Sequence, residues 1–343
     1  MRRPRPSPAT GEGFVAIATL AVATLGLALI LPATANAAPY AYITNQNDDT
    51  VSVVDLATTR AVDTIAVGQA PAGVAVSPDG QRVYVTNPDS KNLSVIDTGS
   101  RKVVATVPAG EGPLAVAVHP DGRAVYVADW YLNRVSAIDP ETLRVTAEIP
   151  VGASPSGIAL DPAGSRMVVT NRDDNTVSVI DIASLKTLAV ILVGSAPFGV
   201  TIDATGSRAY VANVRSDDVS IIDLASRTVI GTAAVREFPY AIAIDEARQR
   251  LFVTNQHDDS VSVIDLASRK EIANIPMGGY PEGIEIGADG RHVYVANWFA
   301  NRLEIIDTAT LDVVGTADTG NGSRAYGRFI APEPRGGQPA VSR

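Results

Sequence analysis

The sequence contains no cysteine, and only 5% of its 343 residues are aromatic. Without cysteine the chain can form no disulfide, thiolate nucleophile, iron–sulfur cluster or covalently attached c-type haem. Histidine is also scarce, because His119, His257 and His292 lie far apart and none has the close spacing of zinc ligands. We therefore expect no metal site and no cofactor, and we interpret the three histidines as surface residues.

Positive charge is in the minority. Lys and Arg total 28 against 37 Asp and Glu, which gives a formal net charge of −9. Proteins that bind nucleic acid through a basic field carry the opposite balance. We therefore expect no nucleic-acid partner.

The first 37 residues have the three parts of a secretory signal peptide. Arginines within the first five residues precede an uncharged run over 14–31, and Ala35 and Ala37 supply the small residues that a signal peptidase requires. We predict cleavage near Ala37 and an extracytoplasmic location, in a periplasm, in a cell wall or in the medium. The alternative is an uncleaved membrane anchor, because these 18 residues can just span a bilayer.

The remaining chain repeats one unit of 42 residues seven times. Three positions define the unit, and we call them the repeat Asn, the repeat Asp and the repeat Pro. They are Asn45, Asn87, Asp129, Asn171, Asn213, Asn255 and Asn297; Asp55, Asp97, Asp139, Asp181, Asp223, Asp265 and Asp307; and Pro71, Pro113, Pro155, Pro197, Pro239 and Pro281, with Ser323 in the seventh place.

Each unit predicts four short β-strands. In the unit from Pro71 to Pro113, β-branched apolar runs lie at 73–76, 83–86, 93–96 and 102–107 and are separated by turn residues. Four strands in a repeat of about 40 residues are typical of a β-propeller blade. A solenoid is the alternative, but no unit resembles a polar capping repeat. We predict an all-β, seven-bladed β-propeller over residues 38–332, followed by a flexible tail over 333–343.

The ends of the repeat region predict how the ring closes. The chain enters at Tyr40 in what reads as the second strand of a blade, and residues 325–330 read as a first strand. We expect this C-terminal strand to complete the blade that residues 40–68 begin. Closure of this kind removes sheet edges that would otherwise promote aggregation.

We interpret most recurring residues as scaffold. A hydroxyl residue follows each repeat Asp three positions later, and such pairs satisfy turn amides locally. The repeat Asn is expected to bond backbone groups at a strand end. The glycines two residues after the repeat Pro, such as Gly73 and Gly157, need little room where the inner strands crowd the ring axis.

The second strands share a four-residue pattern. It reads YITN at 42–45, YVTN at 84–87, YVAD at 126–129, VVTN at 168–171, YVAN at 210–213, FVTN at 252–255 and YVAN at 294–297. In this pattern the chain resembles the YVTN-repeat β-propellers, the YncE-like family. The resemblance implies seven blades and export, and it implies little about activity because one fold hosts many functions.

A function is expected where the repeat is broken. The only two tryptophans follow the repeat Asn of the third and seventh units, and each has an aromatic and an arginine close behind it. The two groups lie four blades apart one way and three the other, so they would face each other across the channel mouth. Their residues are Trp130, Tyr131 and Arg134, and Trp298, Phe299 and Arg302.

The same face should receive the residues that follow the repeat Pro, namely Phe198, Tyr240, Glu282 and Arg324. We predict that these residues and the two tryptophan groups bind a ligand or partner, because Trp and Arg are common anchors. The alternative is that both tryptophans merely cover neighbouring blades.

Glu285 and Glu304 also depart from the repeat pattern, in the same unit as Trp298. We include Glu285 among the candidate binding residues. A buried glutamate would have a raised pKa and could accept a proton, whereas one at a channel wall would be solvated.

We predict a monomeric, exported, non-enzymatic binding protein whose aromatic and arginine face takes a small ligand, a glycan or an extracytoplasmic protein. Membrane contact is expected only through an uncleaved signal segment. Two alternatives stay open. One is a lyase-like or lactonase-like enzyme that uses Glu282, Glu285, Arg324 and Arg328 at the channel mouth. The other, by analogy to propellers of redox systems, is an accessory protein of a periplasmic quinone-cofactor system.

Overall fold

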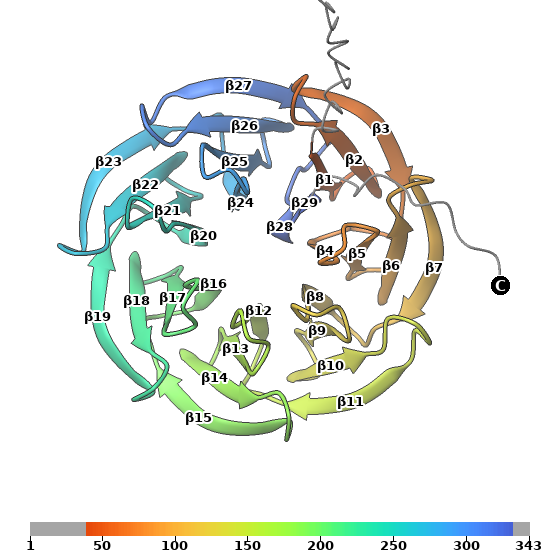
Figure 1. Ribbon diagram of the computed structural model, residues 1–343, viewed down its shortest axis with the longest axis horizontal. Coiled ribbons are helices and arrows are strands. Elements are labelled where there is room, and N and C mark those ends of the chain that lie inside the picture. The colour runs from red at the N-terminus through yellow and green to blue at the C-terminus, as the bar shows by residue number, and fades with distance from the viewer. Residues whose placement is uncertain (1–38, 332–343) are drawn as a thin grey trace, which may run out of the picture. The chain divides into compact units, whose positions relative to one another are not determined.

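The computed structural model describes residues 39–331. They form seven β-sheets arranged as blades in a ring, which confirms the predicted seven-bladed β-propeller (Figure 1). The predicted signal peptide over 1–37 and the predicted tail over 333–343 lie outside the described residues. Within residues 39–331 no helix is long and apolar enough to cross a membrane.

Each blade runs outward from its innermost strand, and the strands that follow one another within a blade from β1 to β27 pair antiparallel. The first blade holds β1 (Tyr40–Asn45), β2 (Thr50–Asp55) and β3 (Arg60–Ala66); the second β4 (Gly73–Val76), β5 (Arg82–Asn87), β6 (Asn92–Asp97) and β7 (Lys102–Pro108); the third β8 (Pro113–Val118), β9 (Val125–Asp129), β10 (Arg134–Ile138) and β11 (Val145–Pro150); the fourth β12 (Pro155–Leu160), β13 (Arg166–Asn171), β14 (Thr176–Asp181) and β15 (Lys186–Leu192). The fifth holds β16 (Pro197–Ile202), β17 (Arg208–Asn213), β18 (Asp218–Asp223) and β19 (Thr228–Ala234); the sixth β20 (Pro239–Asp245), β21 (Arg250–Asn255), β22 (Ser260–Asp265) and β23 (Lys270–Pro276); the seventh β24 (Pro281–Ile286), β25 (His292–Asn297), β26 (Arg302–Asp307) and β27 (Val313–Asp318).

The ring closes through the C-terminal segment, but not through one strand over 325–330 as the sequence suggested. Only β29 (Ile330–Ala331) joins the first blade, antiparallel to β1. The preceding β28 (Tyr326–Arg328) runs parallel to β4 and becomes a fifth strand of the second blade. Where the segment passes from β28 to β29, the carboxylate of Glu285 accepts the backbone N–H groups of Phe329 and Ile330, at 2.6 and 2.8 Å.

A threonine hydroxyl joins neighbouring blades in four of the seven repeats. The Thr86 hydroxyl accepts the N–H of Gly73 in its own blade at 2.8 Å and donates to the carbonyl oxygen of Leu114 in the next blade at 2.7 Å. Thr44, Thr170 and Thr254 donate in the same way, to the carbonyl oxygens of Ala72, Phe198 and Glu282. Each accepting carbonyl belongs to the residue that follows a repeat Pro.

The inner strands approach closely at these carbonyls. A Cβ added at Gly73 would lie 2.3 Å from the Leu114 carbonyl oxygen, and one at Gly157 would lie 2.3 Å from that of Phe198. Real Cβ atoms do not come this close to an oxygen, so glycine is required at these two positions. The structure thus confirms that crowding near the axis selects glycine.

The repeat Asp residues are turn staples, as predicted. The Asp97 carboxylate accepts both the N–H and the hydroxyl of Ser100, and Asp139 does the same with Thr142. These hydrogen bonds hold the pKa of both carboxyls below the usual range. The carboxylates of Asp97 and Asp139 therefore stabilise the turns.

The repeat Asn residues bond backbone groups, as expected, and they also bond side chains: Gly152 donates its N–H to Asn171 at 3.0 Å, and Gly320 donates its N–H to Asn45 at 3.1 Å. All seven are fully buried. In the six repeats that hold asparagine, the amide donates to the side chain seven residues later on the third strand of the blade. Asp129 instead accepts the backbone N–H groups of Glu111, Gly112, Tyr131 and Leu132. Asn171 donates to Ser178 at 3.0 Å, whereas in the seventh blade Asn297 donates to Glu304 at 3.2 Å. Glu304 therefore takes the place of a structural serine.

The interpretation of all three histidines as surface residues is wrong for His119. Its side chain is buried, with Nε2 2.9 Å from the carbonyl oxygen of Gly164 in the next blade and Nδ1 2.5 Å from Asp121. The glycine turn at Gly164 leaves the space that the imidazole fills. This position therefore links two blades.

We expect Thr86→Val to lower the free energy of unfolding by about 1–3 kcal/mol, because it leaves the Leu114 carbonyl and the Gly73 N–H buried without their partner. Thr187→Val on the exposed outer strand β15 is the matched control, with an expected change within about 0.5 kcal/mol. Urea unfolding followed by circular dichroism measures both. Equal effects of the two changes would contradict a special role for the threonine between blades.

Glu285 should make stability depend on pH. Burial raises the pKa of Glu285 from 4.5 to about 7, although Arg328 and the two backbone N–H groups oppose this. Because the folded state then holds a proton that the unfolded state has released, stability should fall as pH rises from about 4.5 to 7, by at most roughly 3 kcal/mol. Unfolding measured across this window should show a shallower slope for Glu285→Gln. Parallel curves for the two proteins would overturn the assignment.

Candidate ligand-binding site

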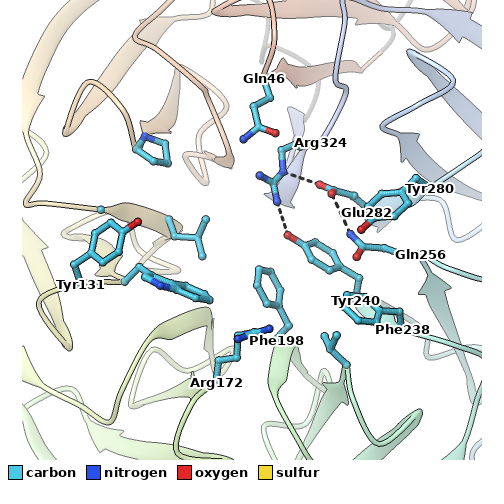
Figure 2. A pocket seen from close by; sticks show the side chains of 15 residues that line it. Gln46, Tyr131, Arg172, Phe198, Phe238, Tyr240, Gln256, Tyr280, Glu282 and Arg324 are labelled. Atoms are coloured by element: carbon cyan, nitrogen blue, oxygen red, sulfur yellow. Dashed lines mark hydrogen bonds and ion pairs between the residues drawn. The ribbon is translucent and has the colours of Figure 1, made fainter.

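A pocket of about 430 Å³ opens where the loops that lead into the inner strands meet. Three positions of the repeat build it, together with Tyr131 (Figure 2). Gln46, Pro88, Trp130, Arg172, Val214 and Gln256 follow the repeat Asn; Leu114, Phe198, Tyr240, Glu282 and Arg324 follow the repeat Pro or its substitute Ser323; and Gly112, Phe238 and Tyr280 precede it.

The structure brings six of the eleven candidate residues to this pocket. They are Trp130, Tyr131, Phe198, Tyr240, Glu282 and Arg324. Their role in binding stays a prediction, but the geometry places them around one cavity. The other five candidates lie outside it.

Three of these five have structural partners elsewhere. Arg134 donates to Glu148 at 2.6 Å on its own blade. Arg302 pairs with Glu304, its Nε lying 2.8 Å from the carboxylate. Glu285 holds the closing segment, and the Arg328 guanidinium lies 3.7 Å from it on the surface. Glu282 pairs with Arg324, whereas Glu285 pairs with Arg328. The four residues of the lyase-like or lactonase-like alternative therefore do not lie around one cavity.

Trp298 and Phe299 do not line the pocket, but they contact residues that do. The indole N–H of Trp298 donates to Oε1 of Gln46 at 3.2 Å, and its ring centroid lies 5.9 Å from that of Tyr280. Phe299 packs edge-on against both Trp298 and Tyr280. The tryptophan group of the seventh blade thus supports two lining residues and does not itself face Trp130 across the cavity.

A buried polar network forms one wall. Nε of Arg324 donates to Glu282 at 2.6 Å, and a terminal nitrogen of the same guanidinium donates to the Tyr240 hydroxyl at 2.6 Å. The Gln256 amide donates to the other Glu282 oxygen at 3.0 Å. Burial lowers the pKa of Arg324, but Glu282 and Tyr240 together raise it above its ordinary value, so the guanidinium stays charged. Burial also raises the pKa of Tyr240 well above its ordinary value, so its hydroxyl keeps its proton.

Aromatic rings form the floor and the opposite wall. Phe198 stacks on Tyr240 with ring centroids 4.2 Å apart, and the ring of Tyr326 packs edge-on against both. Trp130 lies 6.5 Å from Phe198, and the Arg172 guanidinium lies over the Trp130 ring at 5.6 Å. Pairs of this geometry add stability beyond their buried area. The rings therefore form a rigid apolar surface.

Sequence reasoning missed five lining residues with recognisable side-chain chemistry: Gln46, Arg172, Phe238, Gln256 and Tyr280. The signal was present in the register of the repeat. The position after the repeat Asn reads Gln, Pro, Trp, Arg, Val, Gln and Trp through the seven units, and the first six of these residues line the cavity. Only its tryptophans were singled out.

A model of the YNCE-like β-propeller family matches residues 12–121, 102–208 and 203–329 of the chain. No curated protein matches the sequence. Among residues 39–331 no group of three or more His, Asp or Glu side chains is placed to hold a metal ion.

Several solved structures share the fold. Hydrazine synthase of Kuenenia stuttgartiensis is 24% identical with a TM-score of 0.72, over 79% of this chain and 92% of that chain. A functionally unknown protein from Desulfotomaculum acetoxidans is 18% identical with a TM-score of 0.71, over 84% and 99%. The dihydro-heme d1 dehydrogenase NirN, in complex with DHE, is 17% identical with a TM-score of 0.64, over 84% and 74%. Similarity at this level shows the fold alone.

The Glu282–Arg324 pair should be strongly coupled. Arg324→Met leaves the Glu282 carboxylate buried without its cation, so we expect a loss of about 3–5 kcal/mol in the free energy of unfolding. The double variant with Glu282→Gln should regain part of the lost free energy of unfolding, because no buried charge then remains without a partner. Urea unfolding of the wild type, both single variants and the double variant gives the coupling. A double variant as unstable as the sum of the singles would contradict it.

Proposed function

The chain belongs to the YNCE-like β-propeller family, and from this premise we propose that it is an exported, non-enzymatic binding protein whose pocket at the ring axis holds a small ligand. The pocket carries this proposal. Its volume of about 430 Å³ lies within the range of small-molecule sites, roughly 300–1,000 Å³. An apolar lining with a few convergent polar groups is also typical of such sites.

The type of variation among the repeats supports a binding role. The 42-residue spacing continues without insertion from Asn45 to Asp307, so the cavity differs from blade to blade by substitution alone.

The charged groups at the cavity favour binding over turnover. Glu282 is engaged by Arg324 and Gln256, and Arg172 pairs with Asp173 at 3.0 Å. General acid–base catalysis requires a group that is free to exchange a proton with the substrate.

Export is the second part of the proposal, and it rests on the sequence. The signal-peptide pattern over 1–37 supports export of the propeller from the cytoplasm, with cleavage expected near Ala37. There the protein would take up its ligand from the periplasm, the cell wall or the medium.

The decisive measurement compares two masses of the mature protein recovered from its own cell envelope. Native mass spectrometry should give a larger mass than the denatured chain, and the difference is the mass of the bound ligand. Trp130→Ser should abolish the difference, because it removes the ring that flanks the cavity.

Val104→Ser, on the outer strand β7 and 59% exposed, is the control and should keep the ligand. Thermal melting of both variants checks that they are folded. Identical native and denatured masses, together with no binding by any member of a metabolite library, would refute a small-ligand function.

A further inference from the structure

The pocket is chemically two-sided, and its polar side is rich in hydrogen-bond donors. This follows from atoms that can only donate or only accept. The indole N–H of Trp298 can only donate, so the Gln46 atom facing it at 3.2 Å is the oxygen. The NH₂ group of Gln46 is then left for other partners. Gln46 lines the cavity, so this group is available to a ligand (Figure 2).

Arg324 adds charged donors beside Gln46. The segments that carry the two residues run together, because the backbone N–H of Arg324 donates to Thr44 at 2.9 Å and that of Gln46 donates to Gly322 at 2.9 Å. The guanidinium uses Nε and one terminal nitrogen within the protein. Its other terminal nitrogen has no hydrogen-bond partner among the described residues.

Tyr240 completes this side. Its hydroxyl oxygen accepts from Arg324, so its own proton is free to be donated. The Glu282 carboxylate could attract a cation, but it already accepts from Arg324 and from Gln256 and is only 5% exposed. The polar side therefore offers three donor groups, and its negative charge is already compensated.

The opposite side is flat and apolar. Trp130 and Phe198 present rings, and Tyr131 extends from the rim with 72% of its surface exposed. The Arg172 guanidinium over Trp130 makes this side, too, unfavourable for a cation. Flat rings of a ligand gain contact area against such a surface.

If the cavity holds a small ligand, as proposed above, we infer that this ligand is a flat, ring-bearing carboxylate. Its rings lie against Trp130 and Phe198, and its carboxylate is bound by Arg324, Gln46 and Tyr240. Hydrogen bonds between a guanidinium and a carboxylate are roughly twice as strong as neutral ones, so charge should decide between ligands of equal shape.

The test uses two probes of the same shape, naphthoate and its neutral amide, naphthamide. They are titrated into the mature protein at about 0.15 M salt, where long-range repulsion by the acidic surface is screened. Ligand-observed NMR gives both dissociation constants. We expect naphthoate to bind about tenfold more tightly, the effect of one charge-assisted contact.

Variants identify the residues that cause the difference in affinity between naphthoate and naphthamide. The double change Glu282→Gln with Arg324→Met removes both charges together, and it should bring the ratio of the two affinities close to one. Gln46→Leu, which leaves the ion pair intact, should reduce the ratio part of the way. Trp130→Ser should weaken both probes alike, and Val104→Ser should change neither.

The outcomes separate the inference from the proposed function. Equal affinity for both probes, with both lost in Trp130→Ser, would overturn the carboxylate and leave a small-ligand pocket. Preference for naphthoate that disappears in Arg172→Met but survives the double change would overturn the assignment to Arg324. No binding of either probe would overturn the ring-bearing carboxylate, whereas the native-mass comparison would still decide whether the cavity binds a ligand.

Discussion

The hydrogen bond from a threonine of one blade to the inner strand of the next is the constraint on which the pocket depends. Thr170 donates to the carbonyl oxygen of Phe198, and Thr254 donates to that of Glu282. Gly157 lies against the same Phe198 carbonyl, where no side chain fits. The side chains of Phe198 and Glu282 line the cavity, whereas their backbone carbonyls are held by the threonines. The scaffold therefore fixes the backbone of a residue whose side chain faces the cavity, and that side chain can vary from blade to blade without disturbing the contact between blades.

Closure of the ring and assembly of the site depend on the same C-terminal segment. Arg324 and Tyr326 come from the segment that leads into the closing strands, and Gln46 comes from the loop after β1. Arg324 reaches Glu282 and Tyr240 of two other blades, while Tyr326 supports Phe198 and donates to its carbonyl oxygen at 3.2 Å. A chain that failed to close would lose the polar wall together with the aromatic floor. Ligand binding should consequently stabilise the closed ring, because a ligand that binds only the folded form shifts the equilibrium towards it.

The sequence predicted the fold because its evidence is local and repeated seven times. Alternating apolar strands, turn residues and the Asp-hydroxyl staples each act within one blade. The missed features depend on contacts between blades. His119 is buried by Gly164 of the next repeat, and Glu285 of another blade accepts two backbone N–H groups of the closing segment. For the site, the rarity of tryptophan pointed to Trp130, which lines the cavity, but also to Trp298, which only donates a hydrogen bond to the lining residue Gln46. Gln46 and Gln256 are unremarkable in a polar loop until the ring brings them to one axis.

The 42-residue repeat does not require the charges at 282 and 324. The equivalent positions of other blades hold Leu114, Phe198 and Tyr240, so the ring accepts apolar and aromatic side chains there. A buried ion pair is weak evidence for stability, because desolvation offsets much of the attraction between the charges. Here the pair holds Arg324 in one orientation, with Tyr240 and Gln256 arranged around it, at the edge of an apolar cavity. An oriented guanidinium facing aromatic rings is an arrangement that a ligand can use and that the fold does not need.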